Sequence, residues 1–181
     1  WLSIYTLVEE LRVDKTAPVD TVGAEALPER IHGEKIFRFQ VLIALMLSSQ
    51  TKDAQVGETM RKLQKHGLNP ENIRNTSDAD LNAFIYSVGF RNNKTKYIKA
   101  TVEILIAQYD GDIPPNTEEL MKLPGVGPKM AYLIENLALN KVTGISVDTH
   151  MHRIFNQLKW VKAKDPEKTR EQLEGWLPRD R

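Results

Sequence analysis

The segment from Leu123 to Lys129 reads LPGVGPK and holds two glycines at alternate positions. Glycine permits positive φ and lets another backbone approach closely, so the segment favours a tight turn between two helices. A helix that begins directly after such a turn presents unpaired N–H groups and the positive end of its dipole, which together bind a phosphate oxygen. Gly125, Val126 and Gly127 are therefore candidate phosphate ligands. The alternative is a helix connection whose glycines serve packing alone, because a short glycine motif is weak evidence.

Lys129 at the end of this motif and Asp148, 19 residues later, are the candidate catalytic pair. A cation in the first turn of a helix is disfavoured by the helix dipole, so Lys129 needs an explanation other than surface charge. A neutral amine can attack an electrophilic carbon and form a covalent intermediate. Asp148 stands where another helix should begin and could place a negative charge opposite the lysine. Its alternative role is that of a plain N-cap, which needs no chemistry.

The elements that must position these residues show the 3.6-residue repeat of helices rather than the alternation of strands. Helices are expected near residues 3–11, 36–47, 53–66, 76–88, 97–110, 117–123, 128–139, 148–158 and 165–177. Ser3, Asp53, Asp148 and Asp165 stand where N-caps would satisfy free amides. Residues 16–33 should form a loop, and residues 142–147 are strand-like but too short and solitary for a sheet. The sequence predicts an all-α protein of about eight to ten helices.

Composition limits the chemistry that these 181 residues can perform. They include no cysteine, which excludes a disulfide, a thiolate-bound metal and a cysteine nucleophile among them. His150 and His152 lack companion ligands, so no metal site is expected. The longest apolar run, residues 41–47, is far shorter than the ~20 residues of a spanning helix, so no membrane partner is expected.

The net charge of +1 shows no overall excess that would attract a polyanion, so any such partner must be held locally. Two stretches without acidic residues could form a track for phosphates, although such runs are usually only solvated faces. Their basic residues are Arg91, Lys94, Lys96 and Lys99 in the first stretch and Arg153, Lys159, Lys162 and Lys164 in the second.

Four motifs in this order resemble the endonuclease III family of DNA glycosylases, particularly its eukaryotic members. They are the hairpin motif of residues 123–129, the segment VDTHMHR at 147–153, the segment SSQTKD at 48–53, and Gly89-Phe90 with Lys94, Lys96 and Tyr97. The resemblance implies a helix-hairpin-helix glycosylase fold with two helical subdomains and the active site in the cleft between them. One subdomain would comprise residues 31–141, and the other residues 1–30 and 142–181.

In that family the hairpin lysine is the nucleophile and the aspartate its catalytic partner, which the resemblance carries onto Lys129 and Asp148. It implies an enzyme of base excision repair that excises oxidised pyrimidines from double-stranded DNA. The same lysine would then cleave the strand at the abasic site by β-elimination through a Schiff base. Gln50 would bond the orphaned partner base, and Phe90 would wedge into the stack. Further DNA contacts are expected from Arg91, Lys94, His150 and Arg153.

The chain departs from the family in lacking the four cysteines that usually hold a four-iron four-sulfur cluster, so no cofactor is expected in it. It would be a fragment or a cluster-free relative, with an incomplete second subdomain that exposes apolar surface around Trp176 and Leu177. The protein is expected to be a monomer and not to be secreted, and if its source is eukaryotic the resemblance implies the nucleus and mitochondrion. Two alternatives remain open: a non-catalytic helix-hairpin-helix module that only grips DNA, and an 8-oxoguanine-type glycosylase.

Overall fold

The computed structural model describes residues 1–17 and 19–178, and every regular element within them is helical, which confirms the predicted all-α fold. No helix in this part of the chain combines the length and apolarity needed to cross a membrane. The elements are α1 (Leu2–Leu11), α2 (Val19–Val22), the 3₁₀ turn η1 (Arg30–His32), α3 (Glu34–Ser48), α4 (Asp53–His66), α5 (Pro70–Asn75), α6 (Asp78–Phe84), α7 (Arg91–Tyr109), α8 (Thr117–Leu120), α9 (Pro128–Leu139), α10 (Thr149–Gln157) and α11 (Pro166–Glu174).

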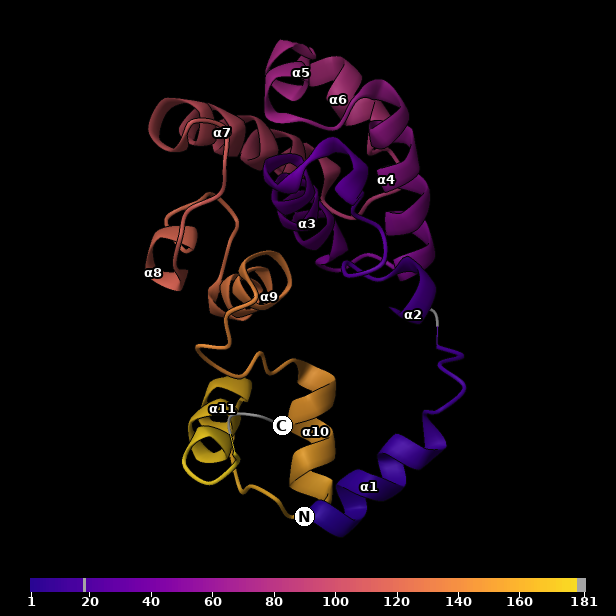
Figure 1. Ribbon diagram of the computed structural model, residues 1–181, viewed down its shortest axis with the longest axis vertical. Coiled ribbons are helices and arrows are strands. Elements are labelled where there is room, and N and C mark those ends of the chain that lie inside the picture. The colour runs from indigo at the N-terminus through magenta and orange to yellow at the C-terminus, as the bar shows by residue number, and fades with distance from the viewer. Residues whose placement is uncertain (18, 179–181) are drawn as a thin grey trace.

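Helix α3 is the centre of the larger of two apolar clusters. Phe37 and every residue from Phe39 to Leu47 are buried, because α4, α7 and α9 all pack against this helix (Figure 1). A helix covered on most of its faces needs no polar side, which explains the unbroken apolar run in the sequence. Each fully buried leucine or isoleucine in it stabilises the fold by about 1.5–3 kcal/mol.

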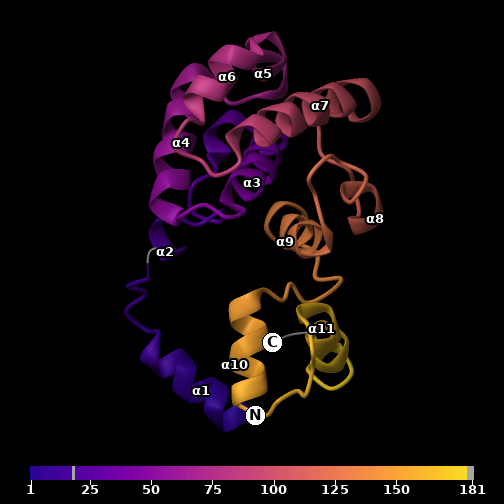
Figure 2. The same cartoon turned by 180° about the vertical axis from the view of Figure 1, so that it is seen from behind.

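The smaller cluster lies at the opposite end of the molecule and involves α10 and α11. Its buried side chains are Val147, Val161 and Leu173. Beside it, Trp1 from the start of α1 packs edge-on to Trp160 and lies 5.9 Å from Trp176, measured between ring centroids. The two opposite views agree that α1, α10 and α11 form one end and α3 to α7 the other (Figure 2).

The expected division at residue 31 stays a prediction, although two separate apolar clusters suit it. Leu27 packs in the larger cluster and α2 contacts α4, so that cluster includes residues before the expected boundary. In the smaller region Trp176 is 38% exposed and Leu177 is half-buried, while α1 has no buried residue at all. The exposed apolar surface therefore runs along α1 as well as around Trp176.

Several local predictions differ from the structure at helix ends. Asp148 and Asp165 are N-caps whose carboxylates accept hydrogen bonds from backbone amides three residues later, as predicted. Asp53 is instead the first residue of α4, after an N-cap at Lys52 that makes no side-chain bond. Likewise α1 begins after Trp1 without a side-chain cap, so Ser3 has no capping role. Helices α2 and α5 are also additional to the predicted set.

Candidate active site

Lys129 and Asp148 lie together, with Nζ of Lys129 3.7 Å from Oδ2 of Asp148. Lys129 is the second residue of α9, and Asp148 is the N-cap of α10, where its other carboxylate oxygen accepts a 2.7 Å hydrogen bond from the amide of Met151. The side chains are 51% and 33% exposed, so solvent or a ligand can reach both groups. Asp148 is thus an N-cap and a neighbour of the lysine amine at once.

The segment between α9 and α10 brings this pair together. The hydroxyl of Ser146 donates a 3.0 Å hydrogen bond to the backbone carbonyl of Lys129, which ties the segment to the start of α9. Gly144 lies against the ring of Tyr132 so closely that a Cβ there would come within 2.5 Å of it. Sequence reasoning did not find Ser146 or Tyr132, because neither belongs to a recognisable local pattern.

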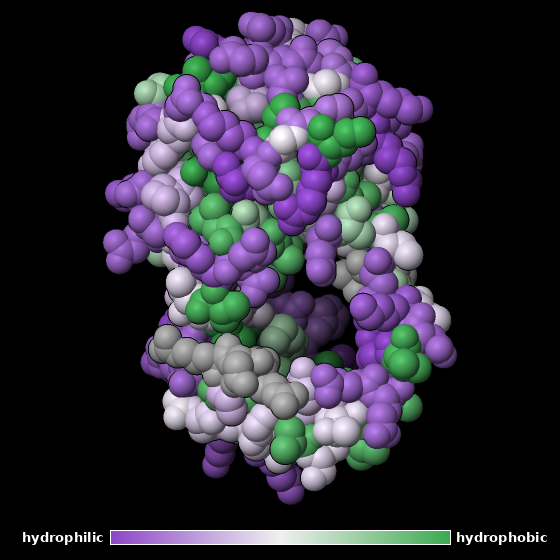
Figure 3. All heavy atoms as spheres, viewed as in Figure 1, coloured by the Kyte–Doolittle hydropathy of each residue, from purple (hydrophilic) through white to green (hydrophobic). Residues whose placement is uncertain are grey.

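The pair opens into a cleft of about 1190 Å³, which is large enough for a ligand the size of a nucleotide. Figure 3 shows the molecule hollowed between its two halves. Gln50, Lys129, Asp148 and His150 all line the cleft, together with Lys15, Asp20, Glu25 and Asp53. The cleft therefore collects several charged side chains beside the candidate pair.

The hairpin turn before α9 has the features of a phosphate site that the sequence suggested. Gly125 has a φ of +78° and lies against the ring of Tyr97 on α7, where a Cβ would come within 2.7 Å. Gly127 is the N-cap of α9 and has no side chain to bond the first amides, and a Cβ added to it would meet no atom within 4 Å. Val126 is buried, and its amide donates a 3.1 Å hydrogen bond to the carbonyl of Leu123, so it is not free for a phosphate as the sequence suggested. No side chain therefore caps the amides at the start of α9.

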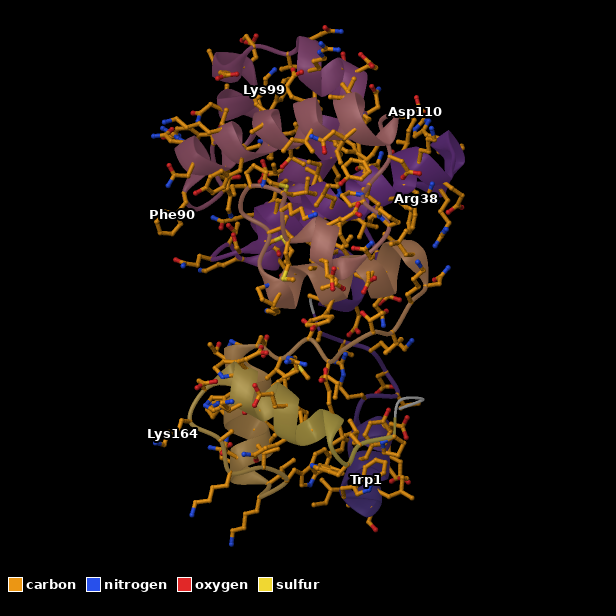
Figure 4. The ribbon with its side chains drawn as sticks, turned by 90° about the vertical axis from the view of Figure 1, so that its left-hand side faces the viewer. Trp1, Arg38, Phe90, Lys99, Asp110 and Lys164 are labelled. Atoms are coloured by element: carbon orange, nitrogen blue, oxygen red, sulfur yellow. The ribbon has the colours of Figure 1, made fainter. Side chains whose placement is uncertain are left out.

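Gln50 and Phe90 are exposed residues of two loops that touch each other. Both have left-handed backbone conformations, with φ of +50° and +57°. Gly89, which precedes Phe90, lies so close to Gln50 that a Cβ would be 2.5 Å from the carbonyl oxygen of Gln50. Phe90 is 63% exposed and projects from the side of the larger region (Figure 4). These positions suit residues that enter a partner molecule.

The first basic stretch is not the continuous track that the sequence suggested. Lys94 is 5% exposed and its amine is enclosed by loop oxygens, so it is not available to a DNA phosphate. Lys99 donates hydrogen bonds to three backbone carbonyls. Arg91 remains near the surface with its guanidinium over the ring of Tyr86, and Lys96 is exposed. The run of charge along the sequence did not reveal that Lys94 is buried or that Lys99 binds backbone carbonyls.

In the second stretch the four predicted basic residues, Arg153, Lys159, Lys162 and Lys164, are all exposed. His150 lines the cleft, whereas Nδ1 of His152 is hydrogen-bonded to the hydroxyl of Thr169 between α10 and α11. The two histidines therefore have different surroundings although they are neighbours in the sequence. Among the described residues no group of three or more histidine or carboxylate side chains could hold a metal ion.

An exposed amine beside a carboxylate in an open cleft can perform nucleophilic chemistry. The amine can attack an electrophilic carbon, and the carboxylate can stabilise a positive charge or accept a proton. The neighbouring hairpin amides can bind an anionic group such as a phosphate.

The chain matches the profile described as HhH-GPD superfamily base excision DNA repair protein over residues 43–179. It is 50% identical to Endonuclease III-like protein 1 of Gallus gallus over 99% of this chain and 65% of that relative. It is 38% identical to the Endonuclease III homolog of Encephalitozoon cuniculi over 98% of this chain and 79% of the relative. The chain spans between 48% and 60% of the length of several other curated relatives that it matches.

Solved endonuclease III structures share the fold. A non-covalent endonuclease III–DNA complex superposes with a TM-score of 0.80 at 28% identity, over 99% of this chain and 78% of that one. A trapped covalent endonuclease III–DNA intermediate with an estranged adenine gives 0.74 at 32% identity, over 79% of this chain and 67% of that one.

These comparisons correct the expectation that no cofactor belongs to the protein. That expectation rested on the absence of cysteine, but the chain spans only 65% and 60% of two of its relatives. The residues present do not fit an iron–sulfur cluster, because they lack the four thiolates that would hold it, and this absence carries no conclusion about the whole protein. The chain belongs to the HhH-GPD superfamily of base excision DNA repair proteins, within which it is a homologue of endonuclease III.

Proposed function

We propose that this chain removes a damaged base from duplex DNA and then cleaves the strand through a covalent intermediate on Lys129. The observation that carries the proposal is the 3.7 Å separation of Lys129 Nζ and Asp148 Oδ2 at the mouth of the cleft. An ion pair this exposed contributes at most about 1 kcal/mol to stability, so stability alone gives little reason for it. A DNA complex and a trapped covalent DNA intermediate are known for structurally similar endonuclease III proteins, which supports the proposal.

The reaction begins when the damaged nucleotide leaves the stack and enters the cleft, which costs a few kcal/mol and least for a damaged base. Lys129, as a free amine, attacks C1′ of the sugar, and the bond from C1′ to the base breaks. The base departs with the bonding electrons and takes up a proton. The carboxylate of Asp148 stabilises the positive charge that develops on the sugar.

Opening of the sugar ring then leaves an imine between Lys129 Nζ and C1′. Loss of a proton from C2′ expels the 3′ phosphate by β-elimination, which cleaves the strand. Water hydrolyses the imine and restores the lysine amine, so no redox partner is needed. The hairpin amides of Gly125 and Gly127 would hold a backbone phosphate, while Gln50 and Phe90 would fill the space that the everted base leaves.

The substrate class that we infer is oxidised pyrimidines, as the resemblance of the sequence motifs to the endonuclease III family implies. The similar structures at 28% and 32% identity are endonuclease III–DNA complexes, which supports action on DNA. An 8-oxoguanine glycosylase/lyase of Clostridium acetobutylicum has a TM-score of 0.60 at 21% identity, which shows the fold alone. Rates of excision of thymine glycol and 8-oxoguanine from otherwise identical duplexes would test the inference. Faster release of 8-oxoguanine would contradict it. Action as a monomer in the nucleus, and also in the mitochondrion, is part of the same proposal.

Borohydride trapping on duplex DNA with an abasic site tests the covalent step. Lys129→Gln should abolish the reduced protein–DNA adduct, because no amine then faces C1′. Lys15→Gln is the matched control, since Lys15 lines the same cleft and loses the same charge. Loss of trapping in the control and not in Lys129→Gln would move the nucleophile to Lys15. DNA binding without any adduct in the unmodified chain would instead favour the non-catalytic helix-hairpin-helix module.

A further inference from the structure

Lys94 is a buried cation that the proposed chemistry does not use. It lies in the first turn of α7, and its side chain crosses to the loop that follows α3. The amine donates hydrogen bonds of 2.7 Å to the carbonyl of Leu47, 2.6 Å to the carbonyl of Ser49 and 3.2 Å to the hydroxyl of Thr51. All three protons of the ammonium group therefore have acceptors.

No carboxylate pairs with Lys94 among the ion pairs of the described residues, so oxygen dipoles alone compensate its charge. The carbonyls of Leu47 and Ser49 lie at the C-terminal end of α3, where the helix dipole favours a cation. Burial nevertheless lowers the pKa of Lys94 to about 8. An apolar side chain of similar length would avoid this desolvation but would leave the loop oxygens without their donor.

Two of these three bonds fix the residues on either side of Gln50. Ser49 and Thr51 flank it in the chain, and Lys94 Nζ binds an oxygen of each. Gln50 itself has a left-handed φ of +50°, a conformation that costs a residue other than glycine about 1 kcal/mol or more. The hydrogen bonds from Lys94 to Ser49 and Thr51 therefore hold Gln50 in a backbone conformation that a free loop would not favour.

The same lysine is also bonded to the turn that carries Phe90. Its backbone amide donates a 3.0 Å hydrogen bond to the carbonyl of Phe90, the N-cap of α7. The hydroxyl of Thr51, which Lys94 Nζ contacts, accepts a second hydrogen bond of 3.2 Å from the amide of Gly89. Gly89 in turn lies against the carbonyl of Gln50. Lys94 thus joins the Gln50 loop and the Phe90 turn into one hydrogen-bonded unit.

We propose that Lys94 is a positioning residue that sets Gln50 and Phe90 as a single unit, so that both enter the duplex together when a nucleotide is everted. The proposal rests on the proposed function and assigns Lys94 no contact with DNA. The proposal predicts different effects on duplex and single-stranded substrates. Excision from a paired and stacked duplex requires the unit, whereas attack by Lys129 on an abasic site in single-stranded DNA does not, because there is no stack or partner base to replace.

Single-turnover excision of thymine glycol from duplex DNA by Lys94→Met tests this consequence, since methionine keeps the length and removes the donors. The rate should fall at least tenfold, while borohydride trapping on single-stranded abasic DNA should change less than threefold. Lys99→Met is the matched control. Lys99 lies on the same helix and donates to the carbonyls of Ile73, Arg74 and Thr76, away from Phe90 (Figure 4). Lys99→Met should lower the free energy of unfolding by a similar amount but keep the rate of excision from duplex DNA.

A double mutant separates positioning from a general loss of structure. If Lys94 acts through Gln50, Lys94→Met combined with Gln50→Ala should excise no more slowly than the slower single variant. Losses that multiply would overturn the proposal, as would equal losses in Lys94→Met and Lys99→Met. If Lys94→Met does not fold, Thr51→Val removes the shared hydroxyl and should give the same selective defect at a smaller size. Lack of excision by the unmodified chain would contradict the proposed function itself, a different outcome from all of these.

Discussion

Lys129 and Asp148 lie side by side in the cleft, but the helices that carry them are packed very differently. Helix α9 belongs to an apolar cluster of 28 buried residues, and it buries Ala131, Ile134 and Ala138 in that cluster. Helix α10 has no buried residue of its own and belongs to a cluster of three among the described residues. Lys129 therefore stands on a firmly packed helix and Asp148 beside a thinly packed one.

This difference implies that the two sides of the site have unequal local stability. Regions with few buried apolar contacts open at lower free energy than the core of a protein. The distance between the two charged groups then depends on the segment before Asp148, where Ser146 is bonded to Lys129 and Gly144 packs on Tyr132. Activity should therefore be lost first when the region around α10 opens.

Two leucine substitutions should give the largest effects on stability and show how differently the two apolar clusters are packed. Leu42 and Leu173 are both fully buried, one in each cluster. Leu42→Ala should lower the free energy of unfolding by about 4 kcal/mol, because its neighbours close in from all sides and cannot refill the cavity. Leu173→Ala should cost about 2 kcal/mol, because the small cluster can collapse more easily. Denaturant titrations followed by circular dichroism measure both.

The three tryptophans allow a local readout of the same comparison, since Trp1, Trp160 and Trp176 all lie in the smaller region. In Leu173→Ala the fluorescence transition should precede the circular dichroism transition, whereas in Leu42→Ala the two should move together. Coincident transitions in Leu173→Ala would show that both regions unfold together, which would contradict the inference that the smaller region has lower local stability.

Asp148→Ser should separate the chemical role of Asp148 from its structural one. Serine is also a good N-cap, so α10 should keep its stability to within about 0.5 kcal/mol. The carboxylate is lost, however, and strand cleavage should slow about 100-fold, which corresponds to about 2.7 kcal/mol. Asp148→Ala is the comparison variant, and it should lose about 1 kcal/mol more in stability at a similar rate. Normal cleavage by Asp148→Ser would reduce Asp148 to a plain cap.

Gly144→Ala should disturb the segment 140–148, which is the link between α9 and α10, without changing Lys129 or Asp148. The added Cβ would come within 2.5 Å of the Tyr132 ring, so the segment leading to Asp148 must shift. We expect strand cleavage to fall about tenfold, or about 1.4 kcal/mol, because small displacements at a catalytic pair are costly. Gly175→Ala is the matched control, because a Cβ there would meet only ordinary contacts of 3.4 Å or more, and it should keep the rate of strand cleavage. Equal rates of strand cleavage by both variants would contradict the role of the link.

The parts of this site that sequence could predict are the local ones. The hairpin glycines, the lysine at the start of α9 and the cap at Asp148 are each determined by neighbours a few residues away. The helices followed from a repeat that is equally local. The N-cap Asn69 and the following Pro70 also mark α5, so that missed helix had a signal in the sequence.

The parts that sequence could not predict depend on contacts between distant segments. Lys94 belongs to a basic run, and nothing in that run shows that its amine crosses to carbonyls 45 and 47 residues away. The left-handed backbone of Gln50 and Phe90 is equally hidden, because neither is a glycine. Charge along a chain therefore indicates a surface only after the fold shows which side chains point outward.

Lowering the pH should weaken the link between α9 and α10 through Glu135, and this is the smallest of the predicted effects. This buried α9 carboxylate accepts hydrogen bonds from the hydroxyls of Thr117, next to the hairpin, and Thr143, in the link. Burial opposes its ionisation, but these bonds and the amide of Thr117 outweigh burial and lower the pKa of Glu135. A lowered pKa means that its stabilisation is complete above the ordinary carboxyl range and is lost as pH falls through the folded-state value. Glu135→Gln should therefore cost about 1 kcal/mol at pH 7 and progressively less as pH falls below the ordinary carboxyl range. Free energies of unfolding for both proteins across that range measure the difference, and a cost that stays constant with pH would mean that the charge of Glu135 contributes nothing to the link.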